Sequence, residues 1–194
     1  VTMKKLDIKG IFTRPRQLLL HPEMEWQKIS RENIEGIEVF KNFLVPLSVL
    51  SSVCAILLRL LSTSPLYAIG IGIILFVASV VGSYIAYRVT REYLSNKVAE
   101  ANRMALRLAV YSSAVFIPFH CLSSGFSEGF ISQLMAICSL LCLRTLYVGL
   151  NQLTALDVQY RKSAIVIIGL LVIVSPIIIQ QLLMIMFRIP TIYA

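Results

Sequence analysis

Five long apolar runs constrain this chain more than any other feature of its sequence. They lie at residues 42–61, 67–87, 106–122, 129–150 and 163–187. Each falls in or near the range of about 17–25 residues that a helix needs to cross the hydrocarbon core of a membrane. Helices are expected, because backbone groups in lipid must satisfy one another within the segment. The sequence therefore predicts an all-α polytopic membrane protein, a bundle of five transmembrane helices.

Composition argues against a soluble domain. Hydrophobic residues make up 57% of the chain and charged residues 14%, with a mean hydropathy of +0.79. An ordinary soluble domain has about 45–50% apolar and about 25% charged residues. The net charge of +8 is carried by segments between the apolar runs. Because these basic residues are not interleaved with aromatic residues on a polar surface, nucleic acid is not an expected partner.

The basic residues alternate strictly between successive polar segments, and this sets the expected orientation. Counting Lys and Arg gives eight in residues 1–41, none in 62–66, four in 88–105, none in 123–128, two in 151–162 and one in 188–194. By the positive-inside rule, the N-terminus is then cytoplasmic and the C-terminus outside. The chain divides into a cytoplasmic amphipathic segment (1–41), the transmembrane domain (42–187) and a short external tail (188–194).

The segment before the first run is amphipathic, and it does not have the usual form of a cleavable signal peptide. Pro22 followed by two acids favours a short helix from Pro22 to Ser30, which we expect to lie along the inner leaflet. Its apolar and basic side chains form a candidate surface for lipid or a protein partner: Arg16, Leu19, Leu20, Trp26 and Ile29. The alternative is a simple interfacial anchor that orients the first span.

Four stretches resemble, in order, a known family. They are Arg16-Gln-Leu-Leu-Leu-His-Pro-Glu-Met-Glu-Trp-Gln-Lys-Ile29, then Phe43-Leu-Val-Pro-Leu47, Val110-Tyr-Ser-Ser-Ala-Val-Phe-Ile-Pro118 and Leu146-Tyr-Val-Gly-Leu150. The chain resembles the Yip family of small five-span membrane proteins (Ypt/Rab-interacting proteins), and within it the bacterial branch. The resemblance implies a bacterial inner membrane and a cytoplasmic N-terminus. Eukaryotic members contact Rab-type GTPases in vesicle traffic, a role that these motifs do not carry over.

No catalytic arrangement is visible in the sequence. The five runs contain no acidic residue, the two histidines are His21 and His120, and no phosphate-binding glycine loop is present. All four cysteines lie in apolar runs without the spacing of a zinc site. We therefore expect a non-enzymatic protein without a cofactor or metal, acting as a membrane organiser or adaptor.

Polar residues inside the runs support an alternative function. By the expected topology, five of them lie in the outer half of the bundle: Arg59, His120, Gln133, Gln180 and Gln181. They would line the polar cavity of a small transporter or permease. The favoured interpretation is that they bond between helices or reach the membrane surface.

Two further features of the runs have structural and functional interpretations. Three inner polar residues, Arg144, Tyr111 and Tyr147, lie toward the cytoplasmic side, and Arg144 is expected to snorkel inward or pair with Asp157 or Glu100. Small residues at a spacing of four form a ridge on the second run: Ala78, Gly82 and Ala86. The ridge serves close packing within the chain or, as the less favoured interpretation, a homo-oligomer.

Overall fold

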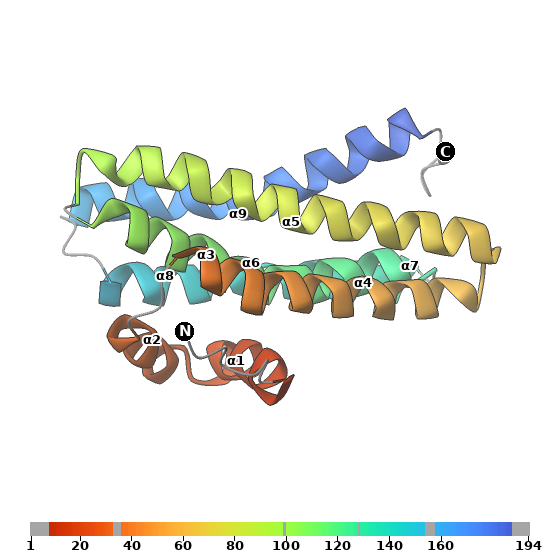
Figure 1. The fold of residues 1–194 in the computed structure, drawn as a ribbon, viewed down its shortest axis with the longest axis horizontal. Coiled ribbons are helices and arrows are strands. Elements are labelled where there is room, and N and C mark those ends of the chain that lie inside the picture. Colours follow the sequence, from red (N-terminus) through yellow and green to blue (C-terminus); the bar gives the residue numbers. More distant parts are fainter. Residues whose placement is uncertain (1–7, 33–35, 99, 128, 154–157, 188–194) are drawn as a thin grey trace.

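The computed structural model describes residues 8–32, 36–98, 100–127, 129–153 and 158–187. Within these residues the chain is a succession of helices joined by short connections (Figure 1). They are α1 (Ile8–Leu20), α2 (Pro22–Arg31), α3 (Gly36–Val39), the π-helix η1 (Phe40–Leu44), α4 (Val45–Leu60), α5 (Pro65–Ser95), α6 (Ala101–Gly125), α7 (Gly129–Ser139), α8 (Leu141–Leu153) and α9 (Val158–Met186).

Five helical stretches among the described residues are long and apolar enough to cross a membrane. They are Phe40–Leu60, Pro65–Ser95, Ala101–Gly125, Gly129–Leu153 and Tyr160–Met186. The predicted all-α fold with five such helices is confirmed. Each stretch overlaps one of the apolar runs. The second continues beyond its run, because the basic residues that follow Tyr87 stay in the same helix.

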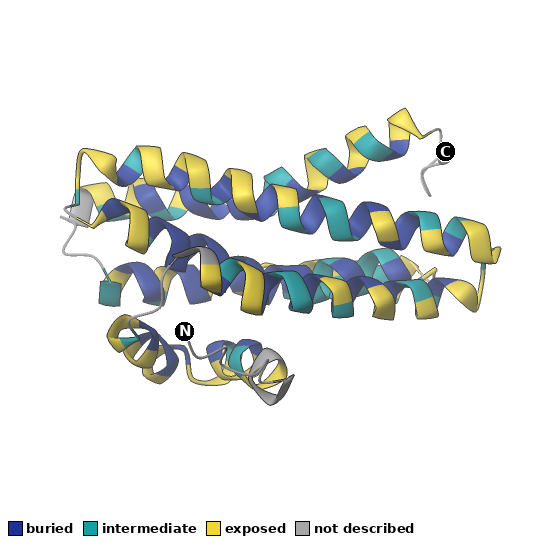
Figure 2. Cartoon of the chain, in the orientation of Figure 1, coloured by how far each residue is buried: buried dark blue, intermediate teal, exposed yellow. Residues whose placement is uncertain are grey.

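Helix α6 is the centre of the bundle and packs against α4, α5, α7 and α8. Its most apolar window is 78% buried, whereas the corresponding window of α7 and α8 is only 22% buried. Figure 2 shows that the outer stretch of α9 is largely exposed as well, so burial is concentrated in α6. The sequence explains it, since small and hydroxyl side chains in α6 let four helices approach closely.

Helices α5 and α9 lie side by side and meet at a glycine. A Cβ atom added to Gly82 would lie 2.7 Å from the Cα and N atoms of Pro176. Ala78 and Ala86 are buried on the same face of α5. The predicted small-residue ridge thus lies against a neighbouring helix of the same chain. Figure 1 shows the C-terminal part of α9 turning away from the bundle. Helix α9 contains Pro176, and proline is a common cause of kinks in helices.

The fourth membrane-crossing stretch is interrupted near its middle. Between α7 and α8, the Leu140 N–H donates to the Ile137 carbonyl at 3.0 Å and the Leu143 N–H donates to the Leu140 carbonyl at 2.9 Å. These three-residue steps are tighter than those of an α-helix. The first stretch begins with the π-helix η1, whose turns are wider than those of an α-helix. Neither irregularity was predicted from the hydrophobic pattern.

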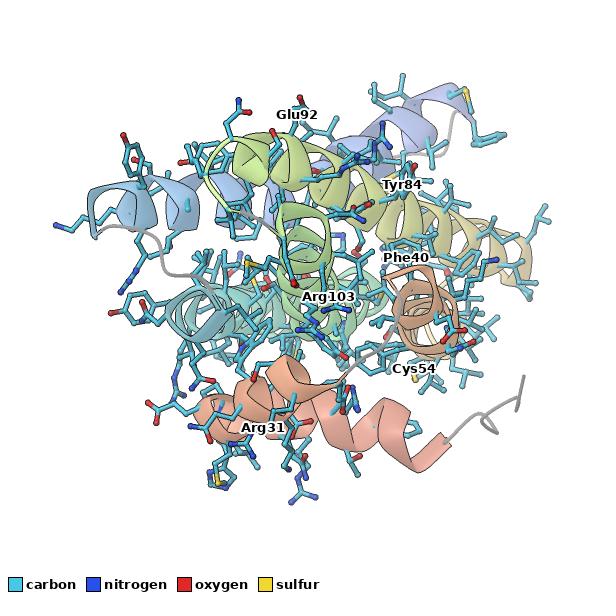
Figure 3. The ribbon with its side chains drawn as sticks, turned by 60° about the vertical axis from the view of Figure 1, so that its left-hand side comes forward. Arg31, Phe40, Cys54, Tyr84, Glu92 and Arg103 are labelled. Atoms are coloured by element: carbon cyan, nitrogen blue, oxygen red, sulfur yellow. The ribbon has the colours of Figure 1, made fainter. Side chains whose placement is uncertain are left out.

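The two ends of the bundle differ in charge. We call the end formed by the α5–α6 and α8–α9 connections the basic end, because it carries Arg88, Arg91, Lys97, Arg103, Arg161 and Lys162. The opposite end contains the α4–α5 and α6–α7 connections. Helices α1 and α2 lie beside the bundle toward its basic end, and they run across the bundle axis (Figures 1 and 3). Helix α2 matches the predicted short helix, whereas α1, which contains Pro15, was not predicted.

Candidate functional site

The N-terminal helices are docked onto the bundle through Trp26. Helix α2 directs this side chain against α8, where it is fully buried. Its indole Nε1–H donates to the Thr145 carbonyl at 2.9 Å. The ring lies over Gly149, where a Cβ atom would come within 2.5 Å of Trp26 Cζ2. The glycine therefore makes room for an aromatic ring from a segment more than a hundred residues away in sequence.

A polar network holds α1 beside Trp26. The Arg14 guanidinium donates to the Tyr111 hydroxyl at 2.7 Å and to both carboxylate oxygens of Glu32, forming an ion pair. Burial acts to lower the pKa of Arg14, but the hydrogen bond and negative charge of Glu32 raise it overall. Because this charge is paired and partly shielded from water, it can fix the angle at which α1 meets α6.

Arg107 also contacts α2. We call the set of contacts that holds α1 and α2 against the bundle, made by Trp26, Arg14, Glu32, Arg107 and Tyr111, the dock. Its guanidinium donates to the Ser30 carbonyl at 3.3 Å and to the Glu32 carbonyl, both at the C-terminal end of α2. A cation at this end of a helix satisfies free carbonyls and complements the helix dipole. Tyr111 meanwhile contacts the rings of Trp26 and Phe43, with centroids 5.8 Å and 5.5 Å apart. The dock thus combines buried aromatic contacts with charge-assisted hydrogen bonds.

The five residues of the candidate lipid or partner surface do not lie on one face. Some are buried or partly buried against the bundle, and the others are exposed on the opposite side of α1 and α2. Trp26 and Ile29 are buried, and Leu19 packs partly against the core. Leu20 and Arg16 are exposed. Two exposed apolar residues that the sequence interpretation did not include lie near them, Phe12 at 57% and Met24 at 56% exposure. The exposed side chains of both helices gather on the side away from the bundle, where Figure 3 labels Arg31.

The five candidate cavity residues of the outer half do not form a single cluster. His120 Nε2 lies 2.7 Å from Gln180 Oε1, and the His120 ring stacks on Phe116. Arg59 instead bonds to the Ser127 hydroxyl at 3.2 Å. The remaining two, Gln133 and Gln181, are exposed. The structure therefore brings two of the five together.

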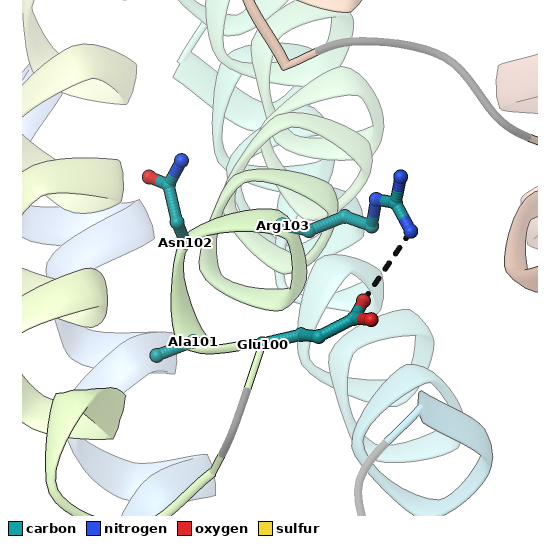
Figure 4. A pocket seen from close by; sticks show the side chains of 4 residues that line it. All are labelled: Glu100, Ala101, Asn102 and Arg103. Atoms are coloured by element: carbon teal, nitrogen blue, oxygen red, sulfur yellow. Dashed lines mark hydrogen bonds and ion pairs between the residues drawn. The ribbon is translucent and has the colours of Figure 1, made fainter.

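The three inner polar residues also lie in different environments. Tyr111 belongs to the dock, whereas Arg144 and Tyr147 are exposed on α8. Of the two acids considered as partners for Arg144, Glu100 pairs with Arg103 at 3.3 Å, and Asp157 lies outside the described residues. A shallow hollow of about 300 Å³ lies at the start of α6 and is lined by residues 100–103. Figure 4 shows the ion pair of Glu100 with Arg103 at this place.

Aromatic rings also hold a lysine at the basic end. Lys97 Nζ lies 3.4 Å from the centroid of the Tyr93 ring and 5.3 Å from that of Tyr160. This contact links the end of α5 to the start of α9. Such cation–π contacts stabilise a connection without an acidic partner. Among the described residues, no group of three or more His, Cys, Asp or Glu side chains is placed to hold a metal ion.

Sequence reasoning missed the three charged residues of the dock. Arg14 and Glu32 are 18 residues apart, and Arg107 lies in another helix. A signal was present in the third run, since Arg107 interrupts its first turns and Tyr111 follows at a spacing of four. A charged and an aromatic residue on one face of a central helix indicate a polar contact, but they do not identify its partner.

These features define the class of protein. The described chain has five helical stretches fit to cross a membrane, with α6 at their centre, and two helices that lie beside the bundle toward its basic end. It is a multi-pass membrane protein in contact with lipid.

The family follows from comparison with known proteins. A family model described as the Yip1 domain matches residues 16–180, most of the chain, and the chain belongs to this family. The matched region begins in α1 and includes Trp26 and all the bundle contacts of the dock except that of Arg14. No curated protein and no solved structure matches the chain.

Proposed function

We propose that this Yip1-domain protein is a non-enzymatic membrane organiser or adaptor. It works in a bacterial inner membrane, with the N-terminus cytoplasmic and the C-terminus outside. The outward face of α1 and α2 engages anionic lipid or a protein partner, and the bundle holds that face at the membrane surface. The protein would then act by binding lipid or a partner and not by catalysing a reaction.

The exposed face of the docked helices is the observation that carries the proposal. Phe12, Arg16 and Leu20 follow one another at a spacing of four, so they share one side of α1. Phe12 and Leu20 are each 57% exposed, and Met24 continues the apolar surface on α2. An apolar face with nearby basic residues is typical of helices that lie in the membrane interface. Each basic residue near an anionic surface contributes about 1 kcal/mol.

Trp26 and Ile29 have a different role within this proposal. Both are buried between α2 and the bundle. They therefore position the outward face of α1 and α2 and do not touch the partner themselves. Loss of Trp26 would release both helices from their crosswise arrangement. Loss of Leu20 or Phe12 would leave the dock intact and change only the outward face.

Co-purification tests the proposal. Native complexes are extracted gently, and bound lipid and protein are identified by mass spectrometry for wild type and three variants. The surface variant (Phe12→Ser with Leu20→Ser) and the dock variant (Trp26→Ala) should both lose the bound partner or anionic lipid. The control variant (Gln17→Ala with Gln27→Ala) alters exposed polar residues of the same helices and should retain it. A partner that survives in both the surface and dock variants would exclude this face.

The contact between His120 and Gln180 favours a second candidate function, that of a small transporter or permease. Hydrogen-bonded polar side chains deep in a bundle can border a path for a solute. A transport path requires access of water to this pair. Gln180→Cys should then react with a membrane-impermeant thiol reagent as Ser64→Cys at the exposed opposite end does. If only Ser64→Cys reacts, the transporter function is excluded.

A further inference from the structure

Arg59 is a buried cation with unused hydrogen-bonding groups. It lies in the last turn of α4, at the opposite end of the bundle, and is only 3% exposed. Its Nη1 donates to the Ser127 hydroxyl at 3.2 Å. Its Nε and Nη2 atoms are buried and have no hydrogen-bond partner among the described residues. Two sides of the guanidinium thus remain without an acceptor in the part of the chain that the structure describes.

No described acid can balance this charge. The described acidic residues all lie in the N-terminal helices, at the start of the first membrane-crossing stretch or at the basic end: Glu23, Glu25, Glu32, Glu38, Glu92 and Glu100. A buried charge that is neither paired nor fully hydrogen-bonded is strongly disfavoured. The arrangement around Arg59 therefore calls for a negatively charged acceptor from elsewhere.

Hydroxyl groups gather around the same arginine from two connections. Ser62 and Thr63, between α4 and α5, donate to the Arg59 carbonyl at 3.3 Å and 2.9 Å. The Ser62 hydroxyl also bonds to that of Ser127, between α6 and α7. A guanidinium fork with adjacent hydroxyls is a donor set well suited to the oxygens of a phosphate group. The α4–α5 and α6–α7 connections thus meet beside the unpaired nitrogens.

We propose that Arg59, together with Ser62, Thr63 and Ser127, forms a binding site for the phosphate group of an anionic phospholipid. Arg59 lies next to the end of the membrane-crossing stretch Phe40–Leu60, where lipid headgroups meet the protein. On binding, the serine hydroxyls exchange their mutual hydrogen bond for bonds to the ligand, and this opening lets Nε and Nη2, which are buried without the ligand, contact two phosphate oxygens as a fork. This site lies at the opposite end of the bundle from α1 and α2 and shares no residue with their outward face.

Thermal unfolding in a neutral detergent tests this site with three probes. Phosphatidylglycerol should raise the Tm of the wild type, because a ligand that binds only the folded state stabilises it. Diacylglycerol, which lacks the phosphate, should not. Inorganic phosphate distinguishes the source of the ligand, since an equal rise would show that the site takes free oxyanions as well as lipid. No rise with phosphatidylglycerol would overturn the proposal.

Variants separate binding from folding. Arg59→Gln should abolish the rise in Tm, and Arg59→Lys should weaken phosphatidylglycerol binding about tenfold, because an ammonium group lacks the planar fork. Ser127→Ala keeps the charge and should weaken binding several-fold, which provides a test if Arg59→Gln fails to fold. Arg91→Gln, an exposed arginine at the basic end, is the matched control and should keep the full response. Unchanged binding in both Arg59→Gln and Ser127→Ala would contradict the site.

Glu128 follows Ser127 in the sequence and lies outside the described residues, so its role needs a separate measurement. The stabilities of Glu128→Gln, Arg59→Gln and the double variant form a cycle that measures their coupling. Additive effects support an acceptor other than Glu128. If each single variant costs as much stability as the double variant, Glu128 supplies the counter-charge and the phosphate site is overturned.

Discussion

At the scale of single residues, Gly149 shows how a missing side chain can determine where a whole segment lies. The Trp26 ring occupies the space that a Cβ atom at this position would need, 2.5 Å from Cζ2 and 2.6 Å from Cε2. The ring cannot easily shift, because its N–H is bonded to the Thr145 carbonyl and it makes a T-shaped contact with the Tyr111 ring. The glycine is required here for close approach, and the indole fixes the position of α2.

Gly149→Ala should therefore loosen the dock. Overpacking of a well-filled site costs about 1–3 kcal/mol, and we expect a loss of thermal stability in this range. Trp26 is the sole tryptophan of the chain, so its fluorescence reports the dock directly. The emission should move to longer wavelength as the ring leaves its buried site.

Gly129→Ala is the matched control for this change. A Cβ atom at Gly129 would meet no atom of the described residues within 4 Å, so this variant should leave both the emission and the stability unchanged. Equal behaviour of the two variants would contradict the close contact between Trp26 and Gly149.

Tyr111 contributes to the same dock through both its hydroxyl and its ring. Its hydroxyl accepts a hydrogen bond from Arg14 at 2.7 Å, while its ring contacts Trp26 and Phe43. Tyr111→Phe keeps the ring and removes the acceptor, so it should cost about 1.5–3 kcal/mol, the range for hydrogen bonds to charged groups. In a cycle with Arg14→Gln, the two losses should not add. Additive losses would show that the two side chains act separately.

At the scale of elements, the contact between α5 and α9 depends on the smallest residue at the crossing. The atoms of Pro176 nearest to a Cβ atom at Gly82 include its backbone Cα and N at 2.7 Å. Backbone atoms cannot rotate out of the way as a flexible side chain can. In membranes such close approach is a main source of helix association, since lipid offers no hydrophobic driving force between helices.

Gly82→Val should separate the two helices and lower the Tm more than a surface substitution does. Val81→Leu is the control, because Val81 is adjacent in sequence but exposed at 40%. Limited proteolysis should show earlier cleavage near the α8–α9 connection in Gly82→Val alone. An unchanged Tm in this variant would mean that α9 is held by contacts elsewhere.

The elements also show what the sequence can and cannot predict. Five apolar runs and Pro22 with its acids were enough to predict the bundle helices and α2, because hydropathy and helix-start signals are local. Helix α1 was missed, since Pro15 argues against a helix through that position. The buried side of α2 was also missed, because its partners Thr145 and Gly149 are distant in sequence. Pairings of this kind, such as Arg14 with Tyr111 or His120 with Gln180, depend on tertiary contacts that periodicity does not contain.

At the scale of the whole molecule, charge is distributed unevenly along the bundle axis. Lys and Arg are concentrated at the basic end and in the docked helices, whereas Arg59 is the only described one at the opposite end. Basic segments are retained on the cytoplasmic side during insertion. The outward face of α1 and α2 would then meet the leaflet whose surface is negative. The orientation of the bundle is thus tied to the proposed function of its N-terminal helices.

Cysteine labelling on intact cells tests this orientation. Ser64 lies at the opposite end and Ser95 at the basic end, and both are exposed. In a variant with its four native cysteines replaced by alanine, Ser64→Cys should react with a membrane-impermeant maleimide in intact cells. Ser95→Cys should react only after the membrane is permeabilised, because the basic end then faces the cytoplasm. The reverse pattern would place the docked helices outside the cell and exclude their contact with the cytoplasmic leaflet.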